Sequence, residues 1–208
     1  AAGQTDQSYN AVAIGTSAGQ NNQGAQCVAI GQEAGQNQTG TQSVAIGAYA
    51  GKTLQGNANV AIGVQSGQNQ FNHQNVALGI NAGKTQSTFN IAIGSENVGQ
   101  EQGDSSIAIG RSAGAGTDLS GQGDSSIAIG NNCAISAQGS SAIAMGIYAG
   151  YISQGNTAVA IGSSAGKVSQ GENSVAIGLS AGQTDQSYNA VAIGPFAGVS
   201  GQLGYAVA

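Results

Sequence analysis

Two segments of the chain come close to the glycine-rich loop that binds nucleotide phosphates. Residues 47–53 read Gly-Ala-Tyr-Ala-Gly-Lys-Thr and residues 79–85 read Gly-Ile-Asn-Ala-Gly-Lys-Thr, whereas the phosphate loop reads G-x-x-x-x-G-K-[ST]. Each segment is therefore one residue short of the required spacing. Neither is followed by a helical pattern whose first turn would aim backbone amides at a phosphate. We expect no nucleotide cofactor.

The other reactive side chains stand alone. His73, the only histidine, has no cysteine or carboxylate at metal-ligand spacing. Asp104 and Asp124 follow glycines, but calcium-binding rolls need many copies of a different glycine pattern. Cys27 and Cys133 lie six repeats apart, too far for a disulfide within one stacked chain, although a bond between two chains stays open. Because no nucleophile, base and orienting group converge, we predict no enzyme, no catalytic residue, no metal and no cofactor.

The strongest signal in the chain is a short repeat. Val-Ala-Ile-Gly, in full or as a close variant, returns thirteen times, usually sixteen residues apart. A fixed short period is typical of a solenoid, in which each repeat is one coil stacked on its neighbours. A helix is excluded because glycine recurs in every period and the apolar spacing is two. The sequence predicts an all-β parallel β-solenoid (β-roll) of about 13 coils of mostly 16 residues, filling residues 1–208 as one domain.

Alternation along a strand predicts which residues form the core. Successive side chains of a strand point to opposite faces, so the first and third motif residues share one face. β-branched side chains suit the inside of a narrow parallel coil. We therefore predict a coil core formed by the first and third motif residues Val12, Ile14, Val28, Ile30, Val44, Ile46, Val60, Ile62, Val159, Ile161, Val175 and Ile177.

The second motif residue is alanine in every copy and would then point outward. A row of identical small side chains would make a smooth stripe against which another copy can pack closely. An alternative is that alanine merely tolerates a tight pleat. The stripe predicts a self-assembly interface made of Ala13, Ala29, Ala45, Ala61, Ala77, Ala92, Ala108, Ala128, Ala144, Ala160, Ala176, Ala192 and Ala208.

Polar residues and charges narrow the partners. Glutamines that share another phase of the repeat are expected to form outward amide ladders from coil to coil: Gln23, Gln55, Gln138, Gln154, Gln170, Gln186 and Gln202. The net charge of -5 does not suit binding to a nucleic-acid phosphate backbone, so we expect no nucleic-acid partner.

No apolar run in the sequence reaches the length of a membrane span. We expect both ends of the sequence to continue into a longer protein or filament.

Three segments carry a family resemblance. Residues 171–178, 103–110 and 42–47 contain the pattern S-[VI]-A-I-G and resemble the head repeats of YadA-like trimeric autotransporter adhesins and related phage and virus fibre repeats. The resemblance implies a left-handed β-roll, three chains side by side with the alanine face between them, and display on a cell or virion surface. The chain departs from the family in its longer period and in showing no neck, stalk or anchor segment.

Three functions follow as expectations. The first is a structural, fibre- or filament-forming solenoid, extracellular or surface-displayed, that forms a homo-oligomer through the alanine stripe. End-to-end stacking of terminal coils, whose strand edges are unpaired, would lengthen the fibre. The second is a trimeric adhesin head that binds host-surface or matrix molecules, with Tyr49, Tyr148 and Phe196 as candidate contacts. The third is ice binding, for which threonine ladders are expected but threonines are sparse.

Overall fold

The computed structural model describes residues 1–38, 40–54, 56–70, 72–96, 98–116 and 121–208. These ranges contain parallel strands and no helix, stacked as a β-solenoid of about 11 turns with a sixteen-residue step. The predicted fold class is confirmed, with slightly fewer turns than the 13 motif copies suggest. Residues Ala1–Gln100 and Glu101–Ala208 form two compact units. The predicted single domain and left-handed coil stay predictions.

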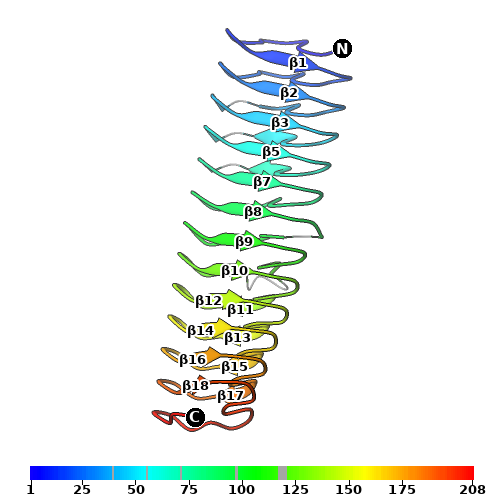
Figure 1. The fold of residues 1–208 in the computed structure, drawn as a ribbon. Helices are drawn as coiled ribbons and strands as arrows, with labels where there is room; N and C mark the ends of the chain where they lie inside the picture. The colour runs from blue at the N-terminus through cyan, green and yellow to red at the C-terminus, as the bar shows by residue number, and fades with distance from the viewer. Residues whose placement is uncertain (39, 55, 71, 97, 117–120) are drawn as a thin grey trace. The chain divides into compact units, whose positions relative to one another are not determined.

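In the first unit, each motif makes one short strand of a parallel sheet (Figure 1). Motif residues pair with their equivalents one turn on, as Ala13 pairs with Ala29. A second, smaller sheet pairs β4 (Thr53–Leu54) with β6 (Asn69–Gln70). The motif strands, in the order in which they stack, are β1 (Val12–Ile14), β2 (Val28–Ile30), β3 (Val44–Ile46), β5 (Val60–Ile62), β7 (Val76–Leu78) and β8 (Ile91–Ile93).

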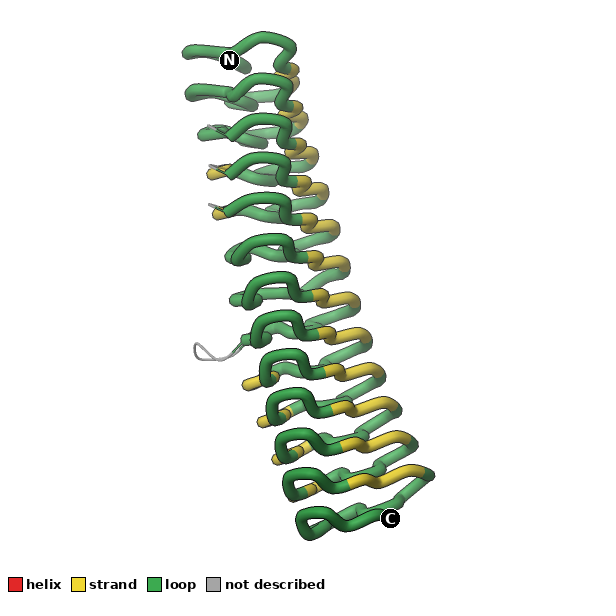
Figure 2. Tube along the Cα trace, turned by 90° about the vertical axis from the view of Figure 1, so that its left-hand side faces the viewer, coloured by secondary structure: helices red, strands yellow, loops and turns green. Residues whose placement is uncertain are grey.

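The second unit repeats this plan with a longer second sheet, so that most of its turns carry two strands (Figure 2). Its motif strands are β9 (Ile107–Ile109), β10 (Ile127–Ile129), β12 (Ile143–Met145), β14 (Val159–Ile161), β16 (Val175–Ile177) and β18 (Val191–Ile193). Its other sheet stacks β11 (Ser136–Gln138), β13 (Ile152–Gln154), β15 (Val168–Gln170) and β17 (Thr184–Gln186).

One turn of the second unit carries four extra residues. Ile107 nevertheless pairs with Ile127, so the motif register survives the insertion. The predicted bulged loop at 115–121 falls largely on residues 117–120, which lie outside the described ranges. The insertion therefore leaves the sheet intact.

Each motif strand ends in a corner that requires glycine. Gly47 has a φ of 125°, a conformation that residues with a Cβ rarely adopt. A Cβ at that position would also lie 2.6 Å from the carbonyl oxygen of Gly63, one turn on. The motif glycine is thus fixed both by its backbone conformation and by the close stacking of successive turns.

The predicted facing of the motif residues is wrong. The alanines of the interior strands point into the coil and are fully buried by their own chain, whereas Ala13 is half-buried and Ala208 is exposed. A side chain that is buried inside its own coil cannot form an interface with another copy. The fully buried alanines are Ala29, Ala45, Ala61, Ala77, Ala92, Ala108, Ala128, Ala144, Ala160, Ala176 and Ala192.

The residues predicted as the coil core are, conversely, on the outside. None of the twelve is buried, and they range from half-buried Val159 to Ile14, which is 57% exposed. This correction applies to Val12, Ile14, Val28, Ile30, Val44, Ile46, Val60, Ile62, Val159, Ile161, Val175 and Ile177.

The narrow interior explains this reversal. A methyl group built on Gly182 would lie 3.2 Å from the Cβ of Ala176, which belongs to the opposite wall of the same coil. The same methyl group would lie 2.7 Å from Oε1 of Gln186. An alanine methyl, a glycine backbone and a flat amide therefore fill the cross-section. A valine or isoleucine at the inward position would overpack it, which is why alanine is constant there.

Candidate self-assembly face

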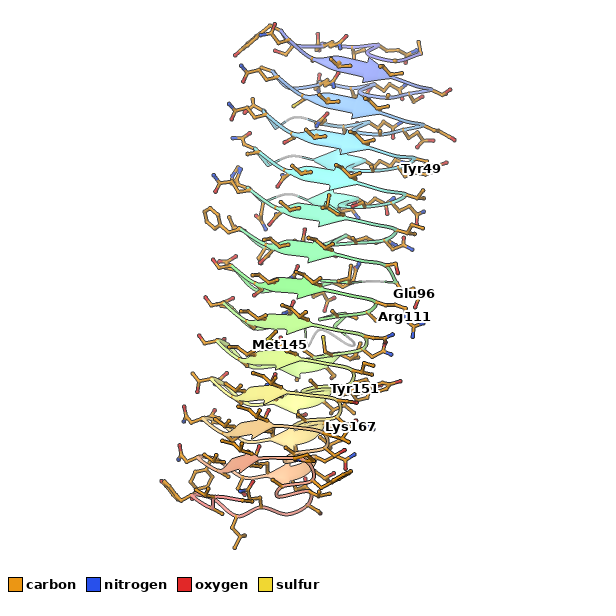
Figure 3. The ribbon with its side chains drawn as sticks, viewed as in Figure 1. Tyr49, Glu96, Arg111, Met145, Tyr151 and Lys167 are labelled. Carbon is orange, nitrogen blue, oxygen red and sulfur yellow. The ribbon has the colours of Figure 1, made fainter. Side chains whose placement is uncertain are left out.

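The outward rows of the motif strands form one apolar face on each unit, which we call the valine–isoleucine face. Met145 on β12, labelled in Figure 3, is 38% exposed, and Ile193 on β18 is 59% exposed. On the second unit the face consists of twelve side chains from six strands: Ile107, Ile109, Ile127, Ile129, Ile143, Met145, Val159, Ile161, Val175, Ile177, Val191 and Ile193. The first unit presents the equivalent residues of β1, β2, β3, β5, β7 and β8.

The face is regular because the strands are in register. Parallel strands lie about 4.8 Å apart, so each row repeats at that spacing. The two rows of one strand are separated by two residues, or about 6.6 Å. Exposed apolar side chains also follow the motif glycine at some turns, namely Val64, Ile80, Ile147 and Leu179. β-branched side chains have few rotamers, so the surface loses little entropy when it is covered.

An internal glutamine ladder holds these strands in place. The prediction that glutamines stack from coil to coil is confirmed, but they lie inside the coil rather than outside it; Gln55 lies outside the described residues. Nε2 of Gln154 donates to Oε1 of Gln170 at 3.1 Å and to the carbonyl of Ile143, in the motif strand of its own turn, at 2.8 Å. Each amide thus links the next turn to a motif strand. The ladder of the second unit runs through Gln102, Gln122, Gln138, Gln154, Gln170, Gln186 and Gln202.

The candidate aromatic contacts occupy one type of corner. Tyr49, Tyr148 and Phe196 all have φ between 55° and 61° and lie two residues after the motif glycine. Lys52 lies 5.6 Å from the ring centroid of Tyr49, and Lys167 lies 5.4 Å from that of Tyr148. Lysine ammonium groups at this distance are attracted to the ring face. Tyr49 and Tyr148 are therefore partly covered by their own chain, whereas Phe196 is 61% exposed.

Both cysteines are free and buried. Cys133 lies six residues after the first motif residue of its turn, at an inward position where most turns carry alanine, as the sequence predicts. Its side chain is fully buried. Burial raises the pKa of the Cys133 thiol from its ordinary value of 9.0 to about 12. Burial also raises the pKa of Cys27, against a smaller lowering by backbone hydrogen bonds from Ser43 and Gln42. Thiols of this kind are protonated at neutral pH and react slowly.

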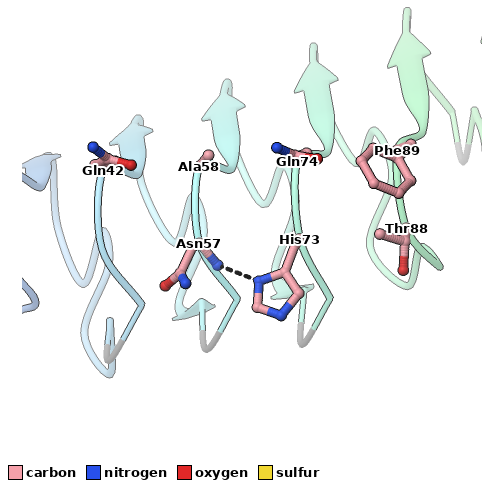
Figure 4. A pocket seen from close by; sticks show the side chains of 7 residues that line it. All are labelled: Gln42, Asn57, Ala58, His73, Gln74, Thr88 and Phe89. Atoms are coloured by element: carbon pink, nitrogen blue, oxygen red, sulfur yellow. Dashed lines mark hydrogen bonds between the residues drawn. The ribbon is translucent and has the colours of Figure 1, made fainter.

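His73 has a structural partner. Its Nδ1 accepts a hydrogen bond of 2.8 Å from the backbone N–H of Asn57, one turn before (Figure 4). Asn57 repeats this arrangement, since its Oδ1 accepts from the backbone N–H of Thr41 at 2.8 Å. His73 therefore continues a ladder of acceptors along one edge of the coil. No group of three or more His, Cys, Asp or Glu that suits a metal ion occurs among the described residues.

A shallow hollow opens beside His73. Its volume is about 390 Å³, and it lies where Ala58 interrupts a column of glutamines. We call it the Ala58 notch; it is lined by Gln42, Asn57, Ala58, His73, Gln74, Thr88 and Phe89. Sequence reasoning missed this site, although the signal was present: Ala58 is the small exception at a phase where Gln26, Gln42 and Gln74 stand.

Comparisons add no relative to this picture. In the part of the chain that the structure describes, no helix has the length and apolar character needed to cross a membrane. No family model, no curated protein and no solved structure matches the chain.

Proposed function

We propose that this chain is a structural, fibre- or filament-forming β-solenoid that assembles laterally with copies of itself through the valine–isoleucine face. The observation that carries the proposal is the outward position of the valine and isoleucine rows on the motif strands. Contiguous apolar patches of this extent on a protein surface mark interaction sites. The motif resemblance supports display outside the cell or on a virion.

The repeat favours a second copy as the partner. Apolar rows at one fixed spacing can interdigitate with rows of the same spacing at every turn, whereas an unrelated surface would match at only a few positions. The twelve side chains of the face on the second unit are uncharged, although Arg111 follows the motif glycine of β9. The partner of this face is therefore another copy of the same sheet.

The free energy of burying this face indicates that many turns must bind the partner together. Full burial of a valine or isoleucine side chain is worth about 1.5–3 kcal/mol. Because most of the twelve residues on the second unit are already half-buried by their own chain, about a third of this value applies to each, which amounts to about 6–12 kcal/mol. The loss of free motion on association costs about 4–15 kcal/mol. One turn alone cannot offset that cost, but the whole face can.

A polar variant of the face tests the proposal. Threonine is β-branched like valine and isoleucine, so it preserves the strand while removing apolar surface. The face variant carries the four substitutions Val159→Thr, Ile161→Thr, Val175→Thr and Ile177→Thr. The matched control carries Ile152→Thr and Val168→Thr on the other sheet. Ile152 is 39% exposed there, close to the 36% of Ile161 on the face.

Light scattering coupled to size exclusion, with negative-stain images, is the measurement. We expect the wild type and the control variant to form oligomers or fibres and the face variant to be a folded monomer. Equal assembly of all three proteins would overturn the proposal. A wild type that stays monomeric at every concentration would do the same.

A trimeric head that binds host-surface or matrix molecules is the second candidate, favoured by the motif resemblance. Lateral contact through the same face would then close after three copies. A discrete particle of three chains by light scattering supports this candidate, and long fibres of uniform width support the first.

A further inference from the structure

We propose that the Ala58 notch is a binding site for one neutral pyranose ring of a glycan. This site lies on the first unit, at an edge of the coil, and it does not depend on assembly through the valine–isoleucine face. The inference follows from the size of the notch, the donors and acceptors that line it, and its lack of charge.

The shape of the notch suits a single ring. Gln42 and Gln74 lie two turns apart, which places their backbones about 10 Å from each other. Ala58 stands between them and leaves the space of one long side chain empty. The hollow of about 390 Å³ lies at the small end of the range for ligand pockets. It fits one sugar ring better than an extended chain.

The polar groups of the notch match hydroxyl groups, which both donate and accept. Since Nδ1 of His73 accepts from the Asn57 backbone, the neutral imidazole carries its proton on Nε2 as a donor. Oδ1 of Asn57 is occupied by the Thr41 N–H, so its amide group offers two N–H donors. The side-chain amide of Gln74 brings a donor and an acceptor to one flank, and Gln42, whose Nε2 donates to Oε1 of Gln26 at 3.3 Å, keeps its second N–H for the other.

An exposed aromatic ring completes the site. Phe89, which lines the notch, is 57% exposed and presents an apolar ring. A pyranose has an apolar face of C–H groups that can pack on such a ring, while its hydroxyls meet amides at the rim. Among the described residues that line the notch there is no lysine, arginine or carboxylate. A neutral sugar is therefore favoured over a phosphate or an acidic sugar.

The backbone holds the site in place before binding. Ala58, Gln74 and Phe89 lie at the same corner of successive turns, with φ of 56°, 59° and 62°. The Gln74 N–H donates to the Asn57 carbonyl at 3.0 Å, and the Phe89 N–H donates to the His73 carbonyl at 3.1 Å. Preorganisation of this kind lowers the entropic cost of binding.

A single substitution at Ala58 can block the notch. In Ala58→Gln, the new side chain fills the notch with the residue that Gln42 and Gln74 already carry at φ of 58° and 59°. The fold should therefore tolerate it. The matched control is Ala137→Gln, an exposed alanine at φ 54° on the second unit. Phe89→Ala removes the ring at a corner where Ala58 shows that alanine is accepted.

The single histidine provides the readout. The His73 ring C–H resonances are followed by NMR while the protein is titrated with methyl β-glucoside, methyl β-galactoside, methyl α-mannoside and methyl N-acetyl-β-glucosaminide, with sorbitol as an open-chain comparison. We expect saturable shifts with at least one glycoside, in the low millimolar range that a single sugar supports, and none with sorbitol. Ala58→Gln and Phe89→Ala should weaken binding by about tenfold or more, and Ala137→Gln should not change it.

Three results would overturn the proposal. They are no saturable shift with any glycoside, an equal response to sorbitol, or undiminished binding by Ala58→Gln. None of these outcomes depends on oligomeric state, so they are separate from the test of the assembly face.

Discussion

Nε2 of Gln154 donates a hydrogen bond of 3.1 Å to Oε1 of Gln170, one turn further along the interior of the second unit. Both side chains are 2% exposed. Nε2 of Gln170 in turn donates to the Val159 carbonyl at 2.8 Å. Amide side chains stacked inside the coil therefore occupy the place that large apolar side chains take in the hydrophobic core of most folds. This ladder determines how the chain responds to substitution.

Removal of one rung should destabilise the unit. Gln170→Ala deletes the donor to Gln186 and to the Val159 carbonyl and the acceptor for Gln154. Because each lost bond costs about 1 kcal/mol and orphaned buried groups cost more, we expect a loss of about 2–4 kcal/mol in the free energy of unfolding. Urea denaturation followed by circular dichroism measures it.

The matched control is an amide ladder on the outside of the first unit. Gln36 donates to Gln20 at 2.9 Å, but both side chains are partly exposed to water. Gln20→Ala should cost less than about 1 kcal/mol, because water replaces the lost partner. Equal losses in the two variants would contradict an interior position for the ladder.

Charge placed on adjacent residues of one strand should have opposite consequences. Ala160 is fully buried inside the coil, and Ile161 is 36% exposed on the valine–isoleucine face. Ala160→Glu buries an unpaired carboxylate and should cost several kcal/mol or prevent folding of the unit. Ile161→Glu should leave the strand folded and reduce lateral assembly. Circular dichroism and light scattering distinguish the two effects; a folded Ala160→Glu variant would show that the alanine faces outward.

The buried thiol of Cys133 predicts a pH dependence of stability. Its folded-state pKa of about 12 exceeds the ordinary value of 9.0, so the folded state keeps a proton that the unfolded chain releases above pH 9.0. The contribution of this thiol to the free energy of unfolding is therefore fully present below pH 9.0 and is lost as the pH rises toward 12. The slope is about 1.4 kcal/mol for each pH unit.

Comparison with Cys133→Ala isolates this contribution, because the other titrating groups are common to both proteins. Alanine is the residue that most turns carry at that position, as in Ala149 and Ala165. The difference in the free energy of unfolding between the two proteins should be constant below pH 9.0 and should shift against the wild type above it. A difference independent of pH would mean that the thiol is not buried.

The repeat was sufficient to predict the solenoid, because its sixteen-residue period and motif glycines leave few other folds open. The facing of the strands was harder. The alternation of a strand predicts only that Ala160 and Ile161 point to opposite sides. The choice between them depends on the width of the interior, where a Cβ built on Gly166 would lie 3.2 Å from the Cβ of Ala160. The constancy of alanine, against the exchange of valine, isoleucine, leucine and methionine beside it, was the available signal.

The Ala58 notch could not be predicted from local pattern alone. It arises because Gln42, Ala58 and Gln74, sixteen residues apart, stack along one edge. The same stacking turns His73 from an isolated histidine into an acceptor for the turn before it. Both features depend on the register between turns rather than on any residue by itself.

The most direct measurement of the central claim is the rate of maleimide labelling of single cysteines in a variant that lacks Cys27 and Cys133. Ala160→Cys and Ile161→Cys are compared at low and at high protein concentration. The account predicts that Ile161→Cys reacts quickly when dilute and slowly when concentrated, as copies cover the face, while Ala160→Cys is protected at both concentrations. Rapid labelling of Ala160→Cys with protection of Ile161→Cys in the dilute protein would contradict it.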